Sequence, residues 1–302
     1  VNNALILQTG LRYNQFMLDA DFSNNLDFFP LPFTTANINN GAFTGSVGGV
    51  YRPTETWAVK ANIGSAFRAP NVDDIGKVFD SEPGAVVVPN PALDAEYAYN
   101  FDLGFVKVFN DIIKVDVTGY YTILENALVR RNFQLNGQDS LLYEGIPSRV
   151  QAIQNAAQAS VYGVQLGLEV KLPNGFSLIS DLSYQVGEEE LEDGSTSASR
   201  HAAPMFGITR LNYQKDELQL QFYANYQAAQ PHEDLAVSEQ SKREIYALDE
   251  NGNTFAPAWY TLNLKASYAL SEIFSLTTGI ENITDQRYRP YSSGISGAGR
   301  NF

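Results

Sequence analysis

The sequence predicts an all-β protein, an antiparallel transmembrane β-barrel to which this chain contributes about 11–12 strands. Three observations lead to this prediction. Apolar and polar residues alternate with a period of two along most of the 302 residues. The alternating segments are about 10–14 residues long, whereas soluble strands usually have about 5–6 residues and a tilted membrane strand needs about 9–11. The connectors are short and long in turn, which is typical of membrane-spanning barrels.

Each strand is recognised by its two faces. In the stretch 217–229, "ELQLQFYANYQAA", every second residue is apolar and the residues between them are mostly amides. The stretch 258–270 has the same pattern. Because successive side chains of a strand point to opposite faces, one set should touch lipid and the other the barrel interior. We expect Leu220, Phe222, Leu262 and Leu264 at the lipid, and Gln221, Asn263 and Lys265 in the interior.

Eleven segments alternate in this way, and a twelfth begins near Gly299. In chain order they cover residues 4–16, 42–52, 56–68, 96–108, 112–125, 159–171, 176–187, 204–215, 217–228, 258–270 and 273–284. The short turns lie at 52–55, 109–111, 173–175, 214–217 and 270–272, and the long connectors at 17–41, 69–95, 126–158, 188–203, 229–257 and 285–298.

The long connector at 70–95 is predicted to be extracellular and to lie at the barrel mouth, because long loops of this kind are usually functional. Its apolar run "AVVV" (85–88) should pack on a neighbouring loop or add a short strand at the rim. The acidic run "EEELED" (188–193) reads as a solvated loop or a loose site for divalent cations.

Composition narrows the classes of function. The 17 Tyr, 18 Phe and 2 Trp suit the aromatic girdles of a membrane barrel, although a large soluble β-sandwich would also use them. A net charge of −14 argues against binding nucleic acid. The chain has no cysteine, which excludes disulfides and thiolate metal sites. No spacing of nucleophile and base points to catalysis, so we expect no enzyme activity.

Four motifs, in order, closely resemble the C-terminal part of the barrel of TonB-dependent outer-membrane receptors. The first two are "FRAP" and "NPALDAE", the third is "NAAQASVYGVQLGLEVKLPNGFSL" and the fourth is "NITDQRYRPY", with "GAGRNF" after it. The residues that match the family's motif positions are Phe67, Arg68, Ala69, Pro70, Asn90, Pro91, Leu93, Glu96, Asn282, Asp285 and Tyr288.

The resemblance implies a barrel of 22 strands, so that residues 1–302 would be about its C-terminal half, without the plug domain. It implies a bacterial outer-membrane protein that imports its cargo with energy from the TonB–ExbB–ExbD complex, which acts through the plug. A ferric siderophore or haem is the implied cargo, and neither a resident cofactor nor a metal site is expected. A passive 12-stranded pore and a TonB-dependent carbohydrate importer are the alternatives.

The substrate-binding candidates are basic, aromatic or imidazole side chains in the long connectors. Arg68 has two possible roles: to pair with Asp73, Asp74 or Glu96, or to meet an anionic substrate. Haem receptors of the family typically carry a histidine between the first two motifs, but 71–89 contains none. The chain's two histidines lie in other connectors and could ligate haem iron. The full set of candidates is Arg68, Lys77, Arg130, Arg131, Phe133, Tyr143, His201 and His232.

Overall fold

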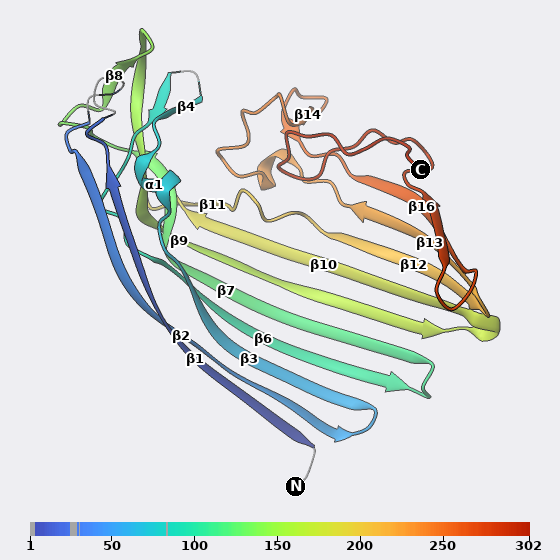
Figure 1. Cartoon of the computed structure of the whole chain (residues 1–302). Helices are drawn as coiled ribbons and strands as arrows, with labels where there is room; N and C mark the ends of the chain where they lie inside the picture. The colour runs from blue at the N-terminus through green and yellow to red at the C-terminus, as the bar shows by residue number, and fades with distance from the viewer. Residues whose placement is uncertain (1–3, 25–28, 30, 83) are drawn as a thin grey trace.

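The computed structural model describes residues 4–24, 29, 31–82 and 84–302, and nearly all of its regular structure is β-strand. Eleven strands of this described part follow one another as antiparallel neighbours in one sheet. The sheet curves into an open trough with short turns at one end and long loops at the other (Figure 1). The strands of this wall are β1 Leu5–Asp21, β2 Thr35–Thr54, β3 Trp57–Arg68, β6 Glu96–Phe109, β7 Ile113–Asn132, β9 Ile146–Lys171, β10 Phe176–Glu190, β12 Phe206–Lys215, β13 Leu218–Gln227, β16 Trp259–Ala269 and β17 Ser275–Ile280.

The eleven predicted segments are therefore confirmed, and Asn301, close to the predicted twelfth, forms an antiparallel bridge with Glu281. Two predicted connectors were too long. The 17–41 connector shrinks to 22–34, because β1 and β2 stay paired up to Asp21↔Thr35. The asparagines of this stretch are poor strand formers and hid the pattern.

The 126–158 connector was too long for a different reason. β7 continues to Asn132, and β9 already begins at Ile146. The pairing of these two strands shifts between Leu124 and Ala127 and again between Ala127 and Leu128. Such bulges break the period of two, so the sequence pattern stops there although the strands do not.

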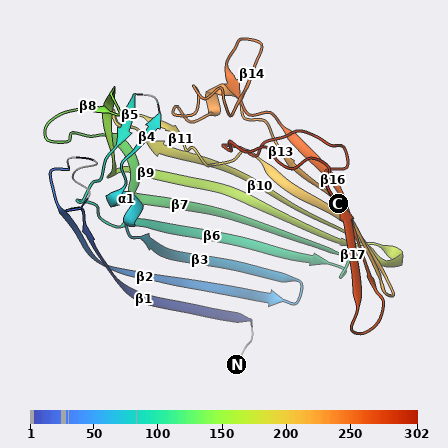
Figure 2. The same cartoon turned by 45° about the horizontal axis from the view of Figure 1, so that its top comes forward.

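We call the end of the trough with the long loops the outer end. These loops contain short helices and strands of their own. These are α1 Val72–Gly76, β4 Phe79–Glu82, β5 Ala85–Val87, β8 Ser140–Tyr143, β11 Thr196–Ala198, η2 His232–Asp234, β14 Ala247–Leu248 and β15 Thr254–Phe255. Both views place α1, β4, β5 and β8 together on one side of the outer end, away from β14 (Figure 2). At the other end, the turn between β9 and β10 is the 3-10 helix η1 Pro173–Gly175.

Residues that tolerate a left-handed backbone close the tight turns. Asn110 and Asp111 have φ values of 48° and 55°, and Asp216 has 50°. Gly175, with a φ of 84°, also comes so close to Gln214 that a Cβ would lie 2.1 Å from its carbonyl oxygen. Glycine is therefore required here on two grounds.

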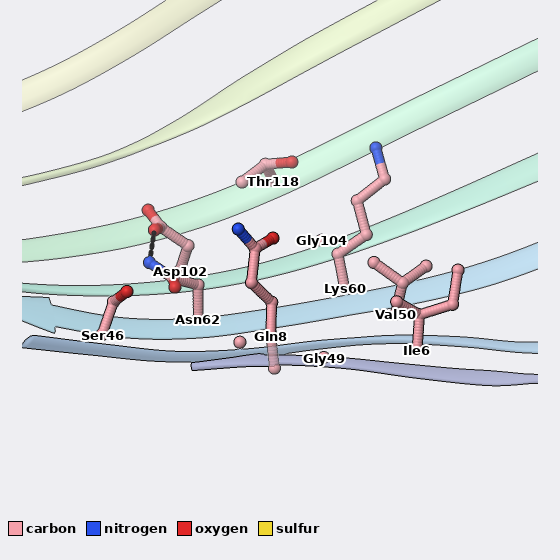
Figure 3. Close-up of a pocket in the computed structure, with 12 residues that line it drawn as sticks. Ile6, Gln8, Ser46, Gly49, Val50, Lys60, Asn62, Asp102, Gly104 and Thr118 are labelled. Carbon is pink, nitrogen blue, oxygen red and sulfur yellow. Dashed lines mark hydrogen bonds between the residues drawn. The ribbon is translucent and has the colours of Figure 1, made fainter. Parts of the chain in front are cut away.

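The polar face of the wall is the concave one. Gln8, Lys60, Asn62 and Asp102 extend to the same side of the sheet (Figure 3). Lys60 on β3 reaches past β6 to Asp116 on β7, with 3.3 Å between Nζ and Oδ2. The Lys60 side chain can cross β6 because its partner on that strand is Gly104, which has no side chain to block it. Similar pairs join neighbouring strands farther along: Lys114–Glu169 at 2.6 Å and Arg210–Asp181 at 2.7 Å.

The predicted faces agree with this arrangement. Gln221 and Lys265 line one hollow of the concave face, and Phe222 and Leu264, which alternate with them, expose 43% and 40% of their surface on the other side. Asn263 lies on the predicted side of the wall but is buried and not solvated. It is 3% exposed, donates to the Tyr223 carbonyl at 3.2 Å, and accepts from the Asn282 backbone N–H at 2.9 Å.

Two apolar clusters lie at the outer end of the trough. One joins the 69–95 region to the tips of β7 and β9, and the other joins it to the ends of β1 and β2. Their buried members are Phe29, Val86, Val88, Leu135, Val150 and Ala152 in the first, and Phe22, Ala36, Ile38, Ile75 and Leu93 in the second. These clusters fix the 69–95 region as a packed part of the mouth.

Candidate functional site

The mouth begins at the end of β3, where the chain leaves the wall. The Arg68 guanidinium donates to both carboxylate oxygens of Asp74, at 2.9 and 3.1 Å. Asp74 and Asn71 also form a capping box at the start of α1, each side chain accepting from the other's backbone N–H. Of the two roles considered for Arg68, the structure shows the ion pair.

The second motif latches the returning chain onto the wall. Asn90 is 7% exposed and donates to the Ile153 carbonyl of β9 at 2.8 Å. Its side-chain oxygen accepts from the Ala92 N–H at 3.1 Å, which forms a local turn. Glu96, at the head of β6, accepts from the Leu128 N–H of β7 at 2.8 Å. The geometry of this motif is architectural.

The apolar run between the two motifs adds a strand at the rim, as predicted. β5 pairs antiparallel with β4 and parallel with β9. Val86 and Val88 are 0% and 1% exposed. The run therefore ties a loop that starts at β3 to the tip of β9, although β6 and β7 lie between these two strands in the sheet.

A basic and aromatic platform lies next to this strand. The Lys77 Nζ atom is 5.3 Å from the centre of the Phe79 ring, and the Arg130 guanidinium carbon is 5.5 Å from it. Both distances suit cation–π contacts. Lys77 and Arg130 are exposed, while Phe79 is half-buried. The platform thus brings together two predicted binding residues, Lys77 from the loop after β3 and Arg130 from near the end of β7, and an aromatic ring that the sequence had not singled out.

Arg131 lies beside the platform in the chain but has a different contact. Its guanidinium donates to the Glu190 carbonyl at 2.6 Å. The next residue, Asn132, donates through its backbone and its side chain to Glu192, at 2.7 and 3.0 Å. The acidic run is therefore not a free solvated loop: 188–190 pair with β11, and Glu192 holds the tip of β7.

Phe133 and Tyr143 pack against the first apolar cluster. The Tyr143 ring centre is 6.4 Å from that of Phe29. Desolvation, helped by the negative charges of Glu144 and Asp80, raises the pKa of the Tyr143 hydroxyl. Both side chains are half-buried, so they support the mouth and present only part of their surface.

The two histidines have different surroundings. His201 is exposed in the turn that follows β11. His232 begins η2, and its Nδ1 atom lies 3.1 Å from both the carbonyl oxygen and the hydroxyl oxygen of Thr254. One ring nitrogen of His232 is thus engaged within its own loop.

A buried carboxylate links three outer loops. Glu239 is 0% exposed and is bound by Arg200 and Lys242, each 2.7 Å away. It also accepts from the Tyr246 hydroxyl at 2.5 Å and the Ser292 hydroxyl at 3.2 Å. The partners come from the 191–205, 228–258 and 281–302 regions, so this one carboxylate fastens all three.

The electrostatics of Glu239 follow from its partners. Burial alone would raise the pKa of its carboxyl, but the hydrogen bonds from Lys242 and Tyr246 and the charge of Arg200 outweigh burial and lower it. Sequence reasoning missed Glu239, because no motif or period marks "SEQSKREIY" and its partners are far apart in the chain.

The last motif shapes the chain after β17. Asn282 is 2% exposed and donates to the carbonyls of Gln286 and Ala298, at 2.8 and 3.0 Å. Asp285 accepts from the Arg300 N–H at 2.8 Å. The ring centroids of Tyr288 and Trp259 are 4.4 Å apart. We call residues 286–298 the strap, since both of its ends are held by Asn282.

No group of three or more histidine and acidic side chains in the described ranges could hold a metal ion. Within the same ranges, no helix is long and apolar enough to cross a membrane.

The model of one protein family matches the sequence over residues 1–283, and that family is described as "TonB dependent receptor-like, beta-barrel". No curated protein matches the sequence significantly.

Solved structures share the fold at low sequence identity. The copper transporter OprC superposes with a TM-score of 0.73 and 14% identity, over 99% of this chain and 44% of that one. The ferric enterobactin receptor PfeA of Pseudomonas aeruginosa gives a TM-score of 0.66, 18% identity and coverages of 99% and 41%. The siderophore receptor PirA of Acinetobacter baumannii gives a TM-score of 0.69 and 14% identity, over 99% of this chain and 43% of that one. The chain thus spans less than half of each of these structures.

Proposed function

The chain belongs to the TonB-dependent receptor family, and from this premise we propose that it forms wall and mouth of a bacterial outer-membrane receptor that imports a ferric siderophore. On this proposal, residues 1–302 are barrel, and coupling to TonB–ExbB–ExbD runs through a plug domain. The trough carries its polar, ion-paired face inward and its apolar face outward, as a barrel in a lipid bilayer requires. Receptors of the family are transporters, so no catalytic role is assigned.

The observation that carries the choice of cargo is the platform of Phe79, Lys77 and Arg130. A ferric siderophore brings its iron fully coordinated, so the receptor needs to grip only the organic shell. Two cationic donors held over one aromatic ring suit the oxygen atoms of such a shell. One structural neighbour is named a ferric enterobactin receptor and another a siderophore receptor, which supports the proposal at the level of the family.

Haem is the second candidate for the cargo, and it is supported by the exposed side chain of His201. An exposed imidazole in an outer loop can meet haem iron without rearrangement of the fold. His232 would first have to release Thr254 or use its other ring nitrogen. Carbohydrate import and passive diffusion remain rival proposals that the same experiment separates.

The test is a paired measurement in the complete receptor in cells. The variants are a deletion of residues 72–88 and the single substitution Phe79→Ala, with Phe109→Ala as the matched control. Phe109 is an aromatic residue at the short-turn end that also contacts a lysine, at 5.6 Å. Surface abundance is measured beside growth on ferric siderophores, haem and oligosaccharides supplied one at a time.

We expect normal abundance in all variants, and loss of growth on a ferric siderophore for the deletion and for Phe79→Ala but not for Phe109→Ala. Normal growth on every iron source would show that the platform has no role in uptake. Loss on haem alone would favour the haem receptor, and His201→Ala and His232→Ala would then locate the ligand.

A further inference from the structure

Lys107 is a lysine on the apolar, outward side of the wall. It lies near the short-turn end of β6, three residues after Gly104, and Gly104 borders a hollow of the concave face. Since successive side chains of a strand point to opposite faces, Lys107 points outward. It shares this side of β6 with the exposed rings of Phe105 and Phe109. Lys107 therefore differs from Lys60, which is paired with a carboxylate on the concave face.

The Lys107 ammonium is held in place by a hydroxyl and two rings. Its Nζ atom donates to Thr56 Oγ1 at 3.0 Å and lies 4.7 Å from the ring centre of Trp57 and 5.6 Å from that of Phe109. Trp57 is its direct partner on β3. An ammonium carries three N–H donors, and in the described part of the chain Thr56 accepts one of them. The remaining donors are available to an acceptor that approaches from the outer side.

The exposed rings at the short turns indicate the depth of Lys107 in a bilayer. Trp57 and Phe109 lie beside two of these turns, and Tyr268 and Phe274 flank another; all four are exposed. The turns lie together at one end of the trough (Figure 1). Exposed aromatic side chains at the ends of barrel strands lie at the level of the lipid headgroups. Lys107, in contact with two of these rings, therefore lies at the depth of the lipid phosphates.

The same turn adds a carboxylate farther from the membrane. Thr54 pairs with Trp57, so Glu55 and Thr56 form the tip of the turn, and Glu55 is exposed there. From the lipid outward, the cation comes first and the carboxylate second. A zwitterionic phospholipid has the complementary order, with its phosphate next to the acyl chains and its ammonium group outermost. An anionic phospholipid has no partner for Glu55 and is repelled by its charge.

We propose that Lys107, Glu55, Trp57 and Phe109 bind a zwitterionic phospholipid with a primary ammonium group, in the leaflet at the short-turn end. The phosphate accepts from Lys107, the ammonium group donates to Glu55, and the two rings pack on the glycerol region and the first carbons of the acyl chains. The inference rests on the membrane-embedded wall of the proposed function. It is independent of the cargo and of the mouth.

Trp57 is a direct reporter of this site. The chain has two tryptophans, and the other, Trp259, begins β16 at the outer end. In the complete receptor, Trp259 and all tryptophans outside this chain are replaced by phenylalanine, so that the fluorescence comes from Trp57. The protein is kept in micelles of brominated dodecyl maltoside, which quenches rings that it touches. A lipid that displaces this detergent from the site restores the fluorescence.

Three lipids with the same acyl chains are titrated: phosphatidylethanolamine, phosphatidylglycerol and a phosphate-free galactosyl diacylglycerol. The site variants are Lys107→Gln and Glu55→Gln. Lys60→Gln is the matched control, because it removes the same charge from the neighbouring strand on the concave face, where Lys60 pairs with Asp116. A second reporter, Phe274→Trp combined with Trp57→Phe, reads another exposed ring position at the same end of the wall.

We expect phosphatidylethanolamine to restore the Trp57 fluorescence at the lowest concentration and the galactolipid at the highest. Lys107→Gln should weaken the binding of phosphatidylethanolamine about 3–10-fold, the range for one lost hydrogen bond, and Lys60→Gln should leave it unchanged. Glu55→Gln should remove the preference for phosphatidylethanolamine over phosphatidylglycerol. The reporter at position 274 should respond to the three lipids with similar affinity.

Four results would overturn the site: tighter binding of phosphatidylglycerol than of phosphatidylethanolamine, equal binding of the galactolipid, unchanged affinity in Lys107→Gln, or the same lipid preference at position 274. The gel shift of folded barrels is recorded for each variant. If Lys107→Gln does not fold, the ranking of the lipids in the Trp57 reporter protein and in Glu55→Gln decides.

Uptake of iron in cells is scored separately. A receptor that imports its cargo but binds the galactolipid as tightly as phosphatidylethanolamine keeps the proposed function and loses the lipid site. A receptor that shows the expected lipid preference but imports no iron compound keeps the lipid site and loses the proposed function.

Discussion

Two consecutive residues of β9, Gln165 and Leu166, offer a sharp test of the two faces of the wall. Gln165 lines a hollow of the concave face, and Leu166 exposes 43% of its surface on the other. Being neighbours, they lie at nearly the same depth in any bilayer. We compare Gln165→Arg with Leu166→Arg in the complete receptor.

The expected costs differ because the two surroundings differ. Leu166 has Val117 and Leu182 as its partners on the adjacent strands, so an arginine there would enter an apolar, lipid-facing surface. Arginine near the bilayer midplane costs about 2–4 kcal/mol. The concave hollow around Gln165 contains Asp116 and Asp181, whose carboxylates favour a cation, so the cost there should stay below about 1 kcal/mol.

The assay is reversible unfolding in denaturant from lipid vesicles, followed by tryptophan fluorescence and by the gel shift of folded barrels. A matched pair of uncharged substitutions, Gln165→Ala and Leu166→Ala, separates the effect of charge from the loss of the native side chain. Equal costs for the two arginine variants would refute the assignment of the faces and favour a soluble β-sandwich.

Three further outcomes follow from single contacts. A double-mutant cycle of Arg68→Ala and Asp74→Ala, read from hydrogen exchange of α1, should give a coupling energy of about 1 kcal/mol, the upper end for a partly exposed ion pair. If the cycle gives no coupling and uptake is lost only in Arg68→Ala, Arg68 is instead a substrate contact. Because the pKa of Glu239 is lowered in the folded protein, its contribution to stability is present above the pKa of an unfolded glutamate, about 4.3, and is lost as the pH falls below it. Proteolysis of the outer loops should therefore increase only in acid. An increase between pH 8 and pH 6 would contradict this prediction. Gly163→Ala should lower the free energy of unfolding by about 1–3 kcal/mol, because the new Cβ would lie 2.3 Å from a carbonyl oxygen. The control Gly119→Ala, whose Cβ would have no neighbour closer than 4.0 Å, should change this free energy little in the same denaturant titration.

The wall was predictable because its signal is local. A strand with one face in lipid must alternate, and the pattern is visible in any window of ten residues. The prediction failed where the alternation itself is interrupted, as at the bulges after Leu124. It also failed to mark Asn263 as buried, because amides look alike in a sequence whether they meet water or the backbone of a neighbouring strand.

The mouth was predictable only in part. The sequence indicated that "AVVV" must be covered and that Arg68 had acids within reach, since both inferences need only neighbours in the chain. It gave no sign that Lys77 and Arg130 share the Phe79 ring, or that Glu239 joins three loops. Those contacts depend on where long loops meet in space, and that is set by the order of strands in the wall.

The central claim is that this chain is part of an energised import receptor, and the most direct measurement is uptake of a radioactive ferric siderophore by cells that express the complete protein. Uptake is followed with TonB present, with TonB deleted, and after collapse of the inner-membrane proton gradient. The account predicts saturable uptake that is lost in both of the last two conditions while the receptor stays at the surface. Uptake that is linear in concentration and indifferent to TonB would contradict it and identify a passive pore.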